Sequence, residues 1–324
     1  MRTVFFLYCL VFVTFSNVGI ASEINFLPQW VPHAQFAGYF MASQKGIYDR
    51  YGIHVKILEG GPEKHPDKFL AEGQVDAVSL CLAQGIHLRA RGIPVVNIAQ
   101  LAQHSSMLLV ARKSSGITRV EDLQGKRISV WGGTFAIPIQ AFFLRNNLSV
   151  RAFPQHFSLV LFFRGLVDVV SAMTYNEYHT LLMSGINEDE LSVFSLRHLG
   201  LDFPEDAIFV LQEKFEENPK IWKDFVDATL EGWQYAFAHP EETLDVVMEN
   251  LRQAHFPANR VHQRWMLDKM RDVIIPPNGN DTMGVLKRKD YERVAYTLKD
   301  YYFILSIPEY DLFYRGNKNG AEVR

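Results

Sequence analysis

Two rounds of alternating strand-like and helix-like segments constrain the fold of this chain more than any other feature. In the first round, short apolar and β-branched runs predict strands, at Ile24–Leu27, His54–Leu58, Val75–Leu80 and Pro94–Leu101. Apolar residues three or four positions apart predict the helices between them, at His33–Lys45, Asp67–Glu72 and Leu82–Arg91. This order predicts a parallel sheet with helices on its faces, because a parallel connection needs a crossover helix.

The second round begins near Met107. Its predicted strands are Met107–Ala111, Arg127–Trp131 and Val167–Met173, and its predicted helices are Ile137–Asn146, Phe157–Phe163 and Asn176–Met183. A further strand is predicted at Ile208–Leu211, followed by helices at 220–238, 240–253, 257–271 and 288–304. The expected fold class is α/β with two lobes and a cleft between them. Residues 22–109 and 205–314 would form the first lobe, 110–204 the second and 315–324 a polar tail.

The N-terminal residues 1–21 have the pattern of a secretory signal peptide. Arg2 precedes an apolar run, and the small residues Gly19 and Ala21 suit cleavage after Ala21. A retained membrane anchor is the alternative, but the run is shorter than the roughly 20 residues that a span needs. Cleavage would remove Cys9, which is not in a lipoprotein-type context, and would leave Cys81 as the only cysteine. The mature chain is therefore expected to be an exported, soluble protein without an internal disulfide.

Composition and motifs exclude several classes of function. The chain of 324 residues is 48% hydrophobic with a net charge of −3, which is typical of a globular protein and does not favour nucleic-acid binding. The motifs G-x-S-x-G, G-x-x-x-x-G-K-[ST] and H-E-x-x-H are absent. The histidines are read as isolated, among them His33, His104 and His179, so we expect no metal site and no cofactor.

Aromatic and polar residues gather where predicted strands pass into helices, which is the edge at which α/β sheets bind ligands. Trp30 follows the first strand, Trp131 ends another, and Tyr175, Asn176 and Glu177 follow the strand ending at Met173. An indole or phenol ring offers a flat face to a planar ligand, and a carboxylate can accept from an amino group. Ser79 and Cys81 lie at a similar junction, and the turn at Gly133 and Thr134 offers backbone N–H groups to a carbonyl or anion.

Each of these residues also has a purely structural interpretation. Trp131 could be a core residue, Glu177 could favour its helix dipole, and the turn before Thr134 could be only a turn. Cys81 could be a small buried hydrophobe. Three further tryptophans are read as packing residues of helices, namely Trp222, Trp233 and Trp265.

Several strings of the sequence resemble one family. These are Leu27-Pro-Gln-Trp-Val-Pro-His-Ala-Gln-Phe-Ala-Gly-Tyr-Phe-Met-Ala, Lys45-Gly-Ile-Tyr, Gly60-Gly-Pro, Asp122-Leu-Gln-Gly-Lys-Arg-Ile, Val130-Trp-Gly-Gly, Ala172-Met-Thr-Tyr-Asn-Glu-Tyr and Phe203-Pro-Glu-Asp. They resemble the thiamine-pyrimidine-binding branch of the periplasmic solute-binding proteins, in the SsuA/THI5-like (NMT1/THI5) family. The resemblance implies a type II periplasmic-binding fold whose lobes close on a ligand, and delivery of that ligand to an ABC importer.

The resemblance also implies which residues contact the ligand. Trp30 matches the family's stacking position, and Tyr175 and Glu177 fall in its ligand-contacting segment. Phe36, Tyr39, Gln103 and Asp206 complete the set of candidate ligand-binding residues.

Enzymes that build the thiamine pyrimidine from pyridoxal phosphate belong to the same superfamily. They hold the cofactor on a lysine four residues after an aspartate like Asp76, with a histidine four residues further on. This chain has Leu80 and Gln84 at those positions and lacks their cysteine-rich motif. We therefore expect no catalytic residue.

The sequence favours a monomeric periplasmic protein that binds a small planar heterocycle for an inner-membrane ABC permease. The expected ligand is a hydroxymethyl- or formylaminomethyl-pyrimidine. The alternatives are a pyrimidine synthase, a periplasmic sensor module, and a binder of riboflavin, a sulfonate or another aromatic compound.

Overall fold

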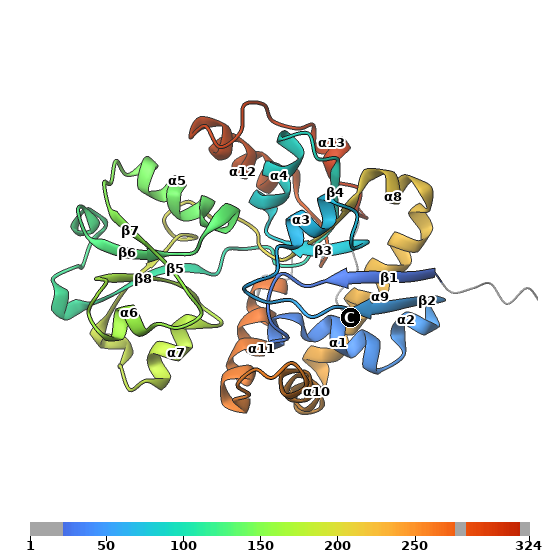
Figure 1. The fold of residues 1–324 in the computed structure, drawn as a ribbon, viewed down its shortest axis with the longest axis horizontal. Helices are drawn as coiled ribbons and strands as arrows, with labels where there is room; N and C mark the ends of the chain where they lie inside the picture. The colour runs from blue at the N-terminus through green and yellow to red at the C-terminus, as the bar shows by residue number, and fades with distance from the viewer. Residues whose placement is uncertain (1–21, 276–282, 318–324) are drawn as a thin grey trace, which may run out of the picture.

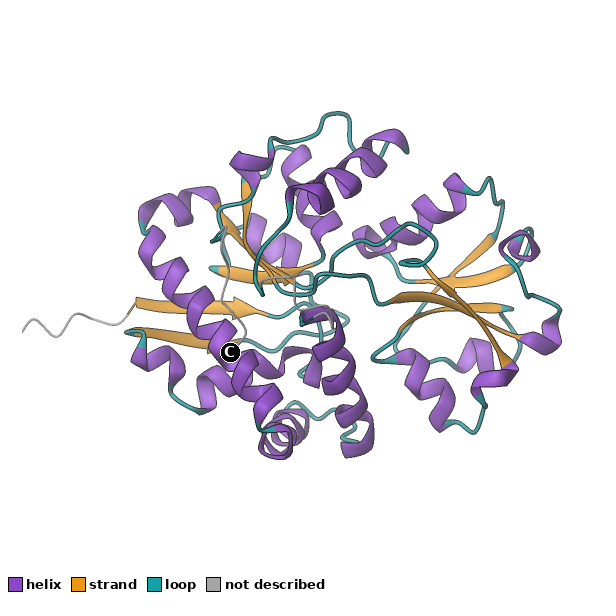
Figure 2. Ribbon diagram, turned by 180° about the vertical axis from the view of Figure 1, so that it is seen from behind, coloured by secondary structure: helices purple, strands orange, loops and turns teal. Residues whose placement is uncertain are grey.

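The two predicted lobes are present in the fold, a computed structural model in which residues 22–275 and 283–317 are described. Each lobe is built around one five-stranded sheet with helices on both faces (Figures 1 and 2). The predicted signal peptide at 1–21 and the end of the polar tail, 318–324, lie outside the described residues. Among the described residues, no helix combines the length and the apolar character that a membrane span requires.

The sheet of lobe 1 has the strand order β2-β1-β3-β10-β4. Its strands are β1 (Ser22–Leu27), β2 (Ile53–Ile57), β3 (Ala77–Leu80), β4 (Val95–Gln100) and β10 (Ala207–Leu211). Strand β1 pairs in parallel with β2 and β3, whereas β10 runs antiparallel to β3 and β4. β3 and β4 consist of buried residues only, as expected for strands covered on both faces.

The sheet of lobe 2 repeats this arrangement with the order β7-β6-β8-β5-β9. Its strands are β5 (Met107–Arg112), β6 (Arg127–Val130), β7 (Arg151–Pro154), β8 (Val169–Met173) and β9 (Leu191–Ser195). Strand β6 pairs in parallel with β7 and β8, and β5 is antiparallel to both β8 and β9. In each sheet, therefore, the fourth strand in this order, β10 or β5, runs antiparallel to the other four.

Helices cover both sheets. Those of lobe 1 are α1 (Ala37–Gln44), α2 (Ile47–Arg50), α3 (Pro66–Ala71), α4 (Leu82–Ala90), α8 (Gln212–Glu217), α9 (Pro219–Ala238), α10 (Pro240–Gln253), α11 (Arg260–Ile274), α12 (Arg288–Asp300) and α13 (Tyr310–Phe313). Those of lobe 2 are α5 (Ile137–Arg145), α6 (Val160–Phe163) and α7 (Glu177–Met183). Short 3-10 turns precede two of these helices, η1 (Ala34–Phe36) before α1 and η4 (Gly133–Ala136) before α5.

The chain passes between the lobes twice, at residues 101–106 and 196–206, and these crossing segments lie side by side in the middle of Figure 1. Carboxyl groups of the second segment bind the first: Asp202 Oδ1 accepts from Ser105 N at 2.8 Å, and Glu205 Oε1 accepts from Ser106 N at 2.9 Å. The backbone carbonyl of Asp206 accepts from Leu101 N at 3.1 Å. The two connections are thus joined to each other and not only to their own lobes.

The prediction of parallel sheets was wrong for one strand in each sheet. β5 is the first strand after the chain leaves lobe 1, and β10 is the first strand after it returns. Each runs opposite to the parallel strands of its sheet. The edge strands β7 and β9 were not predicted, since β7 consists entirely of exposed residues and β9 follows an acidic stretch. The helix predicted at Phe157–Phe163 begins only at Val160, which leaves Phe157 in a loop.

Two glycines allow α1 and α9 to pack closely. A Cβ added at Gly38 would lie 2.2 Å from Cγ of the buried Trp233, and one added at Gly232 would lie 2.2 Å from the carbonyl oxygen of Gly38. We expect Gly38→Ala to lower the free energy of unfolding by about 1–3 kcal/mol through overpacking, measured by urea denaturation. The matched control is Gly61→Ala, where the nearest atom is 3.8 Å away. Equal effects of the two substitutions would contradict close packing as the cause.

Candidate functional site

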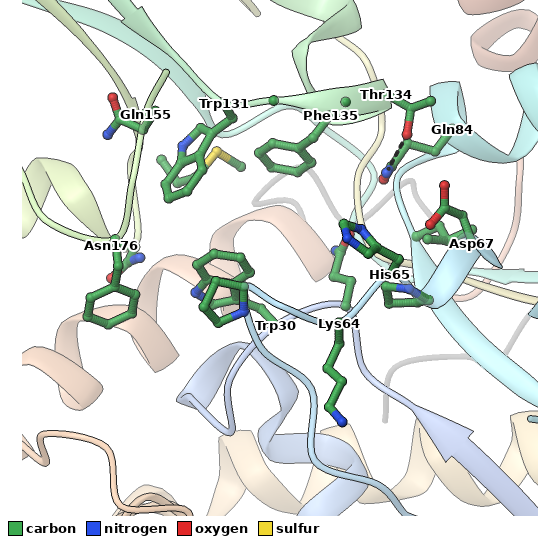
Figure 3. Close-up of a pocket in the computed structure, with 18 of the residues that line it drawn as sticks. Trp30, Lys64, His65, Asp67, Gln84, Trp131, Thr134, Phe135, Gln155 and Asn176 are labelled. Carbon is green, nitrogen blue, oxygen red and sulfur yellow. Dashed lines mark hydrogen bonds between the residues drawn. The ribbon is translucent and has the colours of Figure 1, made fainter. Parts of the chain in front are cut away.

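A cavity of about 400 Å³ lies between the lobes and is lined from both sides (Figure 3). Lobe 1 contributes Gln29, Trp30, Gln35, Leu80, Gln84 and residues 62–67, which include the first residues of α3. Lobe 2 contributes residues 131–135 after β6, residues 155–157 after β7, and Met173, Tyr175, Asn176 and Glu177 at the end of β8. In lobe 2 the lining residues lie at or just after the ends of strands, whereas in lobe 1 this holds for Gln29, Trp30 and Leu80. The volume suits a small ligand, at the low end of the range for ligand pockets.

The walls of the cavity are aromatic. The ring of Trp30 lies edge-on to Trp131 across the gap between the lobes, with centroids 5.3 Å apart and an interplanar angle of 81°. Trp30 is also nearly parallel to Phe157, at 18° and 6.4 Å. Phe157 comes from lobe 2 and is 47% exposed. Flat apolar faces from both lobes thus meet at one place, as the binding of a planar ligand requires.

The polar part of the lobe 1 wall is organised by Asp206. Its carboxylate accepts from Nε2 of Gln35 at 3.1 Å and also from Nε2 of Gln29. Asp206 is 3% exposed, and its φ of 43° is in the left-handed region that non-glycine residues rarely adopt. Burial raises the pKa of this carboxyl to about 6, although the two amide donors oppose the shift. Asp206 itself lies behind the glutamines and does not line the cavity.

Glu177 lines the cavity, but neighbouring residues already bind both of its carboxylate oxygens. Oε2 accepts from Met173 N at 2.8 Å and Oε1 accepts from Asn176 Nδ2 at 2.8 Å. Burial raises its pKa, and these hydrogen bonds oppose the shift. Each oxygen keeps a second lone pair, so the predicted contact with a ligand amino group stays a prediction, alongside the structural role that the hydrogen bonds establish.

Hydrogen bonds connect the lobes beside the cavity. Gln84 Nε2 on α4 donates to Thr134 Oγ1 at 3.0 Å. Asn176 Oδ1 is 2.9 Å from His262 Nε2, and Nδ1 of His262 is 2.9 Å from Nδ1 of His179. Burial, together with nearby His179, lowers the pKa of His262 to about 4, and burial also lowers the pKa of His179. His262 on α11 therefore links lobe 1 to a residue that lines the cavity.

The prediction that the histidines are isolated was wrong for several of them, including His33, whose ring lies edge-on to His262. His179 stacks on His262 and on Trp265, and His104 pairs with Asp202 at 2.7 Å. The sequence does not show these contacts because the partners lie far apart along the chain. Trp265, read as a packing residue, also donates from Nε1 to the carbonyl of Thr174 in lobe 2. Within the described ranges, no group of three or more His, Cys, Asp or Glu residues could hold a metal ion.

Seven of the thirteen candidate residues line the cavity, namely Trp30, Trp131, Gly133, Thr134, Tyr175, Asn176 and Glu177. The remaining six lie elsewhere: Phe36, Tyr39, Ser79, Cys81, Gln103 and Asp206. The predicted contact of these six residues with a ligand therefore stays a prediction, and the lining of the cavity does not support it.

Burial and local hydrogen bonds explain why the six do not line the cavity. Phe36 and Tyr39 belong to the lobe 1 core, where Tyr39 stacks on Phe26 at 4.4 Å. Ser79 Oγ accepts from Gln29 N at 2.9 Å, and the Cys81 thiol lies 3.9 Å from Gln29 Oε1. Gln103 donates from Nε2 to the backbone carbonyl of Gln100 at 2.7 Å.

Sequence reasoning missed five lining residues that now matter, namely Gln29, Gln35, Gln84, Gln155 and Phe157. Gln29 and Gln35 stand inside the string that begins at Leu27, so their proximity to Trp30 was a usable signal. Phe157 carried no signal, because its segment had been assigned to a helix.

Leu80 and Gln84, the positions of the synthases' cofactor lysine and histidine, both line the cavity. An isobutyl side chain cannot form a Schiff base, so the residues here do not fit pyridoxal phosphate at that position. Lys64 also lines the cavity, but Figure 3 shows its side chain directed away from the indole rings.

Comparison with known proteins agrees with this architecture. The chain is 23% identical over 255 residues to the 4-amino-5-hydroxymethyl-2-methylpyrimidine phosphate synthase of Legionella pneumophila, covering 74% of this chain and 77% of that protein. It is 21% identical over 277 residues to the formylaminopyrimidine-binding protein of Halalkalibacterium halodurans, covering 82% of each. The periplasmic aliphatic sulphonate binding protein SsuA of Escherichia coli superposes with a TM-score of 0.69 at 15% identity, covering 90% of this chain and 91% of that structure.

The structural likeness establishes the two-lobed periplasmic-binding-protein fold and, at this identity, nothing finer. The family model described as NMT1/THI5 like matches residues 33–243, which is more than half of the chain. The chain therefore belongs to the NMT1/THI5-like family.

Proposed function

We propose that this protein is the substrate-binding component of an ABC importer and captures a small planar heterocycle. The observation that carries the proposal is the cavity between the lobes, where Trp30 of lobe 1 faces Trp131 and Phe157 of lobe 2. A planar ring placed there would contact both lobes at once. The ligand would therefore stabilise the closed arrangement by its higher affinity for that state.

The proposed ligand is a thiamine pyrimidine precursor, either the hydroxymethyl- or the formylaminomethyl-pyrimidine. The similarity to a formylaminopyrimidine-binding protein and to a synthase named for the hydroxymethyl-pyrimidine supports this class. The N-terminal pattern supports export to the periplasm, where a monomeric binding protein would deliver the ligand to an inner-membrane permease. A sensor module would use the same closure and differ only in its membrane partner.

The proposal disfavours an enzyme of the pyrimidine-synthase type. Leu80 occupies the position of the cofactor lysine, and the chain has only two cysteines, so it lacks the cysteine-rich motif. If the protein were such an enzyme, adding pyridoxal phosphate would shift the cofactor absorbance as a Schiff base forms, and iron would support product formation. We expect neither signal.

Isothermal calorimetry with the exported form of the chain tests the proposal directly. The panel contains both pyrimidines, riboflavin and an alkanesulfonate, and mass spectrometry of the native protein identifies any molecule that co-purifies. We expect saturable binding of a pyrimidine at one site per chain. Folded protein that binds no planar member of the panel would refute the proposal, whereas tighter binding of riboflavin or the sulfonate would move the function to that ligand class.

A further inference from the structure

The hydrogen-bonding polarity of the lobe 1 wall follows from the position of Asp206. An ionised carboxylate only accepts hydrogen bonds, so Gln29 and Gln35 must both turn their NH₂ groups toward it. Nε2 of Gln35 lies 3.1 Å from Oδ2 of Asp206, and Nε2 of Gln29 also donates to this carboxylate. The amide carbonyl oxygens are then the groups left for other partners. Among the described residues, no hydrogen bond to Gln35 Oε1 is found, and Gln29 Oε1 has only the weak thiol donor of Cys81 at 3.9 Å.

The orientation of Asp206 is held by the backbone around it. Its carbonyl oxygen accepts from Leu101 N at 3.1 Å and Ala102 N at 3.4 Å on the other crossing segment. Its φ of 43° is a strained conformation that only surrounding structure can maintain. The carboxylate is therefore fixed before any ligand arrives, and so are the two amides that bind it.

The charges around the cavity disfavour an anion. Carboxylates line it at Glu63, Asp67 and Glu177, and Asp206 lies directly behind its wall. Lys64 is the one lysine among the lining residues, which include no arginine. Sites that bind phosphate or sulfonate groups usually contain arginine or lysine, because these residues supply paired charge-assisted donors.

We propose that the cavity selects an uncharged or cationic heterocycle whose amino group donates to the carbonyl oxygens of Gln29 and Gln35, and that it rejects phosphorylated and sulfonated forms. This inference rests on the proposed binding function and names the chemical class that the site accepts. Asp206 acts as a positioning residue through the two glutamines. A site built to accept hydrogen bonds discriminates strongly against a ligand that lacks the donor, because its acceptors are then left unpaired.

Three matched ligands test the selection in calorimetry: 4-amino-5-hydroxymethyl-2-methylpyrimidine, its 4-oxo analogue and its phosphate ester. For the unmodified protein we expect at least tenfold weaker binding of both the oxo analogue and the ester than of the amino compound. Equal or tighter binding of the oxo analogue or the ester would overturn the inference while leaving the proposed binding function intact. Failure of all three ligands and of the wider panel would instead refute the binding function itself.

The variant Asp206→Asn distinguishes a residue that orients the amides of Gln29 and Gln35 from one that only stabilises the fold. A carboxamide donates as well as accepts, so one glutamine is free to turn its NH₂ group into the cavity. We expect the preference for the amino over the oxo compound to fall at least fivefold. If Asp206 were only structural, both affinities would fall together and the ratio would stay constant.

Glu205→Gln is the matched control for Asp206→Asn. Glu205 is the adjacent buried carboxyl, but it binds Ser105 and Ser106 and neither glutamine. We expect this variant to keep the wild-type ratio of affinities for the amino and oxo compounds. A loss of preference in Glu205→Gln equal to that in Asp206→Asn would overturn the assignment to Asp206.

Discussion

Replacing Trp30 with alanine is expected to weaken binding of the pyrimidine at least tenfold and to change the melting temperature very little. The indole is half-buried in the loop after β1 and faces Trp131 and Phe157 across the cavity. Stacking contributes about 0.5–1.5 kcal/mol beyond area burial, and the loss of buried area adds to it. A tenfold change corresponds to roughly 1.4 kcal/mol. Calorimetry gives the affinity, and a thermal unfolding scan gives the stability.

Trp222→Ala is the control for this prediction. Trp222 lies on α9, is 4% exposed, and donates from Nε1 to the carbonyl of Lys214. Its loss is expected to lower the melting temperature clearly while leaving the affinity of the folded fraction unchanged. If Trp30→Ala instead lowers stability as much as Trp222→Ala and binds within twofold of wild type, Trp30 is a core residue and the proposed site is wrong.

A large effect on stability is expected from Glu205, whose carboxyl is buried between the two crossing segments. Burial raises its pKa from 4.5 to about 8, and nearby Asp206 adds to the shift. Because the folded-state pKa is raised, the associated stability is fully present below pH 4.5 and is lost as the pH rises toward 8. At 1.36 kcal/mol per unit, this difference is worth on the order of 5 kcal/mol. The protein should therefore be markedly less stable at pH 9 than at pH 5.

Glu205→Gln should remove most of this pH dependence. The amide oxygen can still accept from Ser105 Oγ and Ser106 N, which both bind the single oxygen Oε1 in the native protein. Urea denaturation at pH 5, 7 and 9 gives the free energies of unfolding. We expect the variant to match the native protein at pH 5 and to exceed it by several kcal/mol at pH 9. Parallel curves for the two proteins would contradict a buried, protonated Glu205.

The alternation of strand-like and helix-like segments was enough to predict the two α/β lobes, because periodicity is a local property of the chain. It could not predict that β5 and β10 run antiparallel. Each of these strands is an ordinary apolar run, and its direction depends on which lobe the chain has just left. The exposed edge strand β7 has no buried face, so it left no hydrophobic pattern to detect.

The candidate site was predicted best for residues that stand next to a strand end, because strand ends can be recognised in the local sequence. Trp30 lies shortly after β1, Trp131 comes directly after β6, and both line the cavity. Phe36 and Tyr39 stand close to Trp30 in the sequence, yet they point into the lobe 1 core. A helical turn separates residues that face the cavity from residues that face the core, and resemblance of a string does not distinguish the two.

Strand ends and the aromatic residues beside them were therefore determined by the sequence alone. The tertiary structure alone decided the polarity of the cavity, because Asp206 lies 177 positions from Gln29 and meets it only after the chain has passed through lobe 2 and back. It likewise brought His179 to His262, 83 positions away. Periodicity reports which face of an element is buried, whereas hydrogen-bond partners across the fold depend on how the two lobes pack.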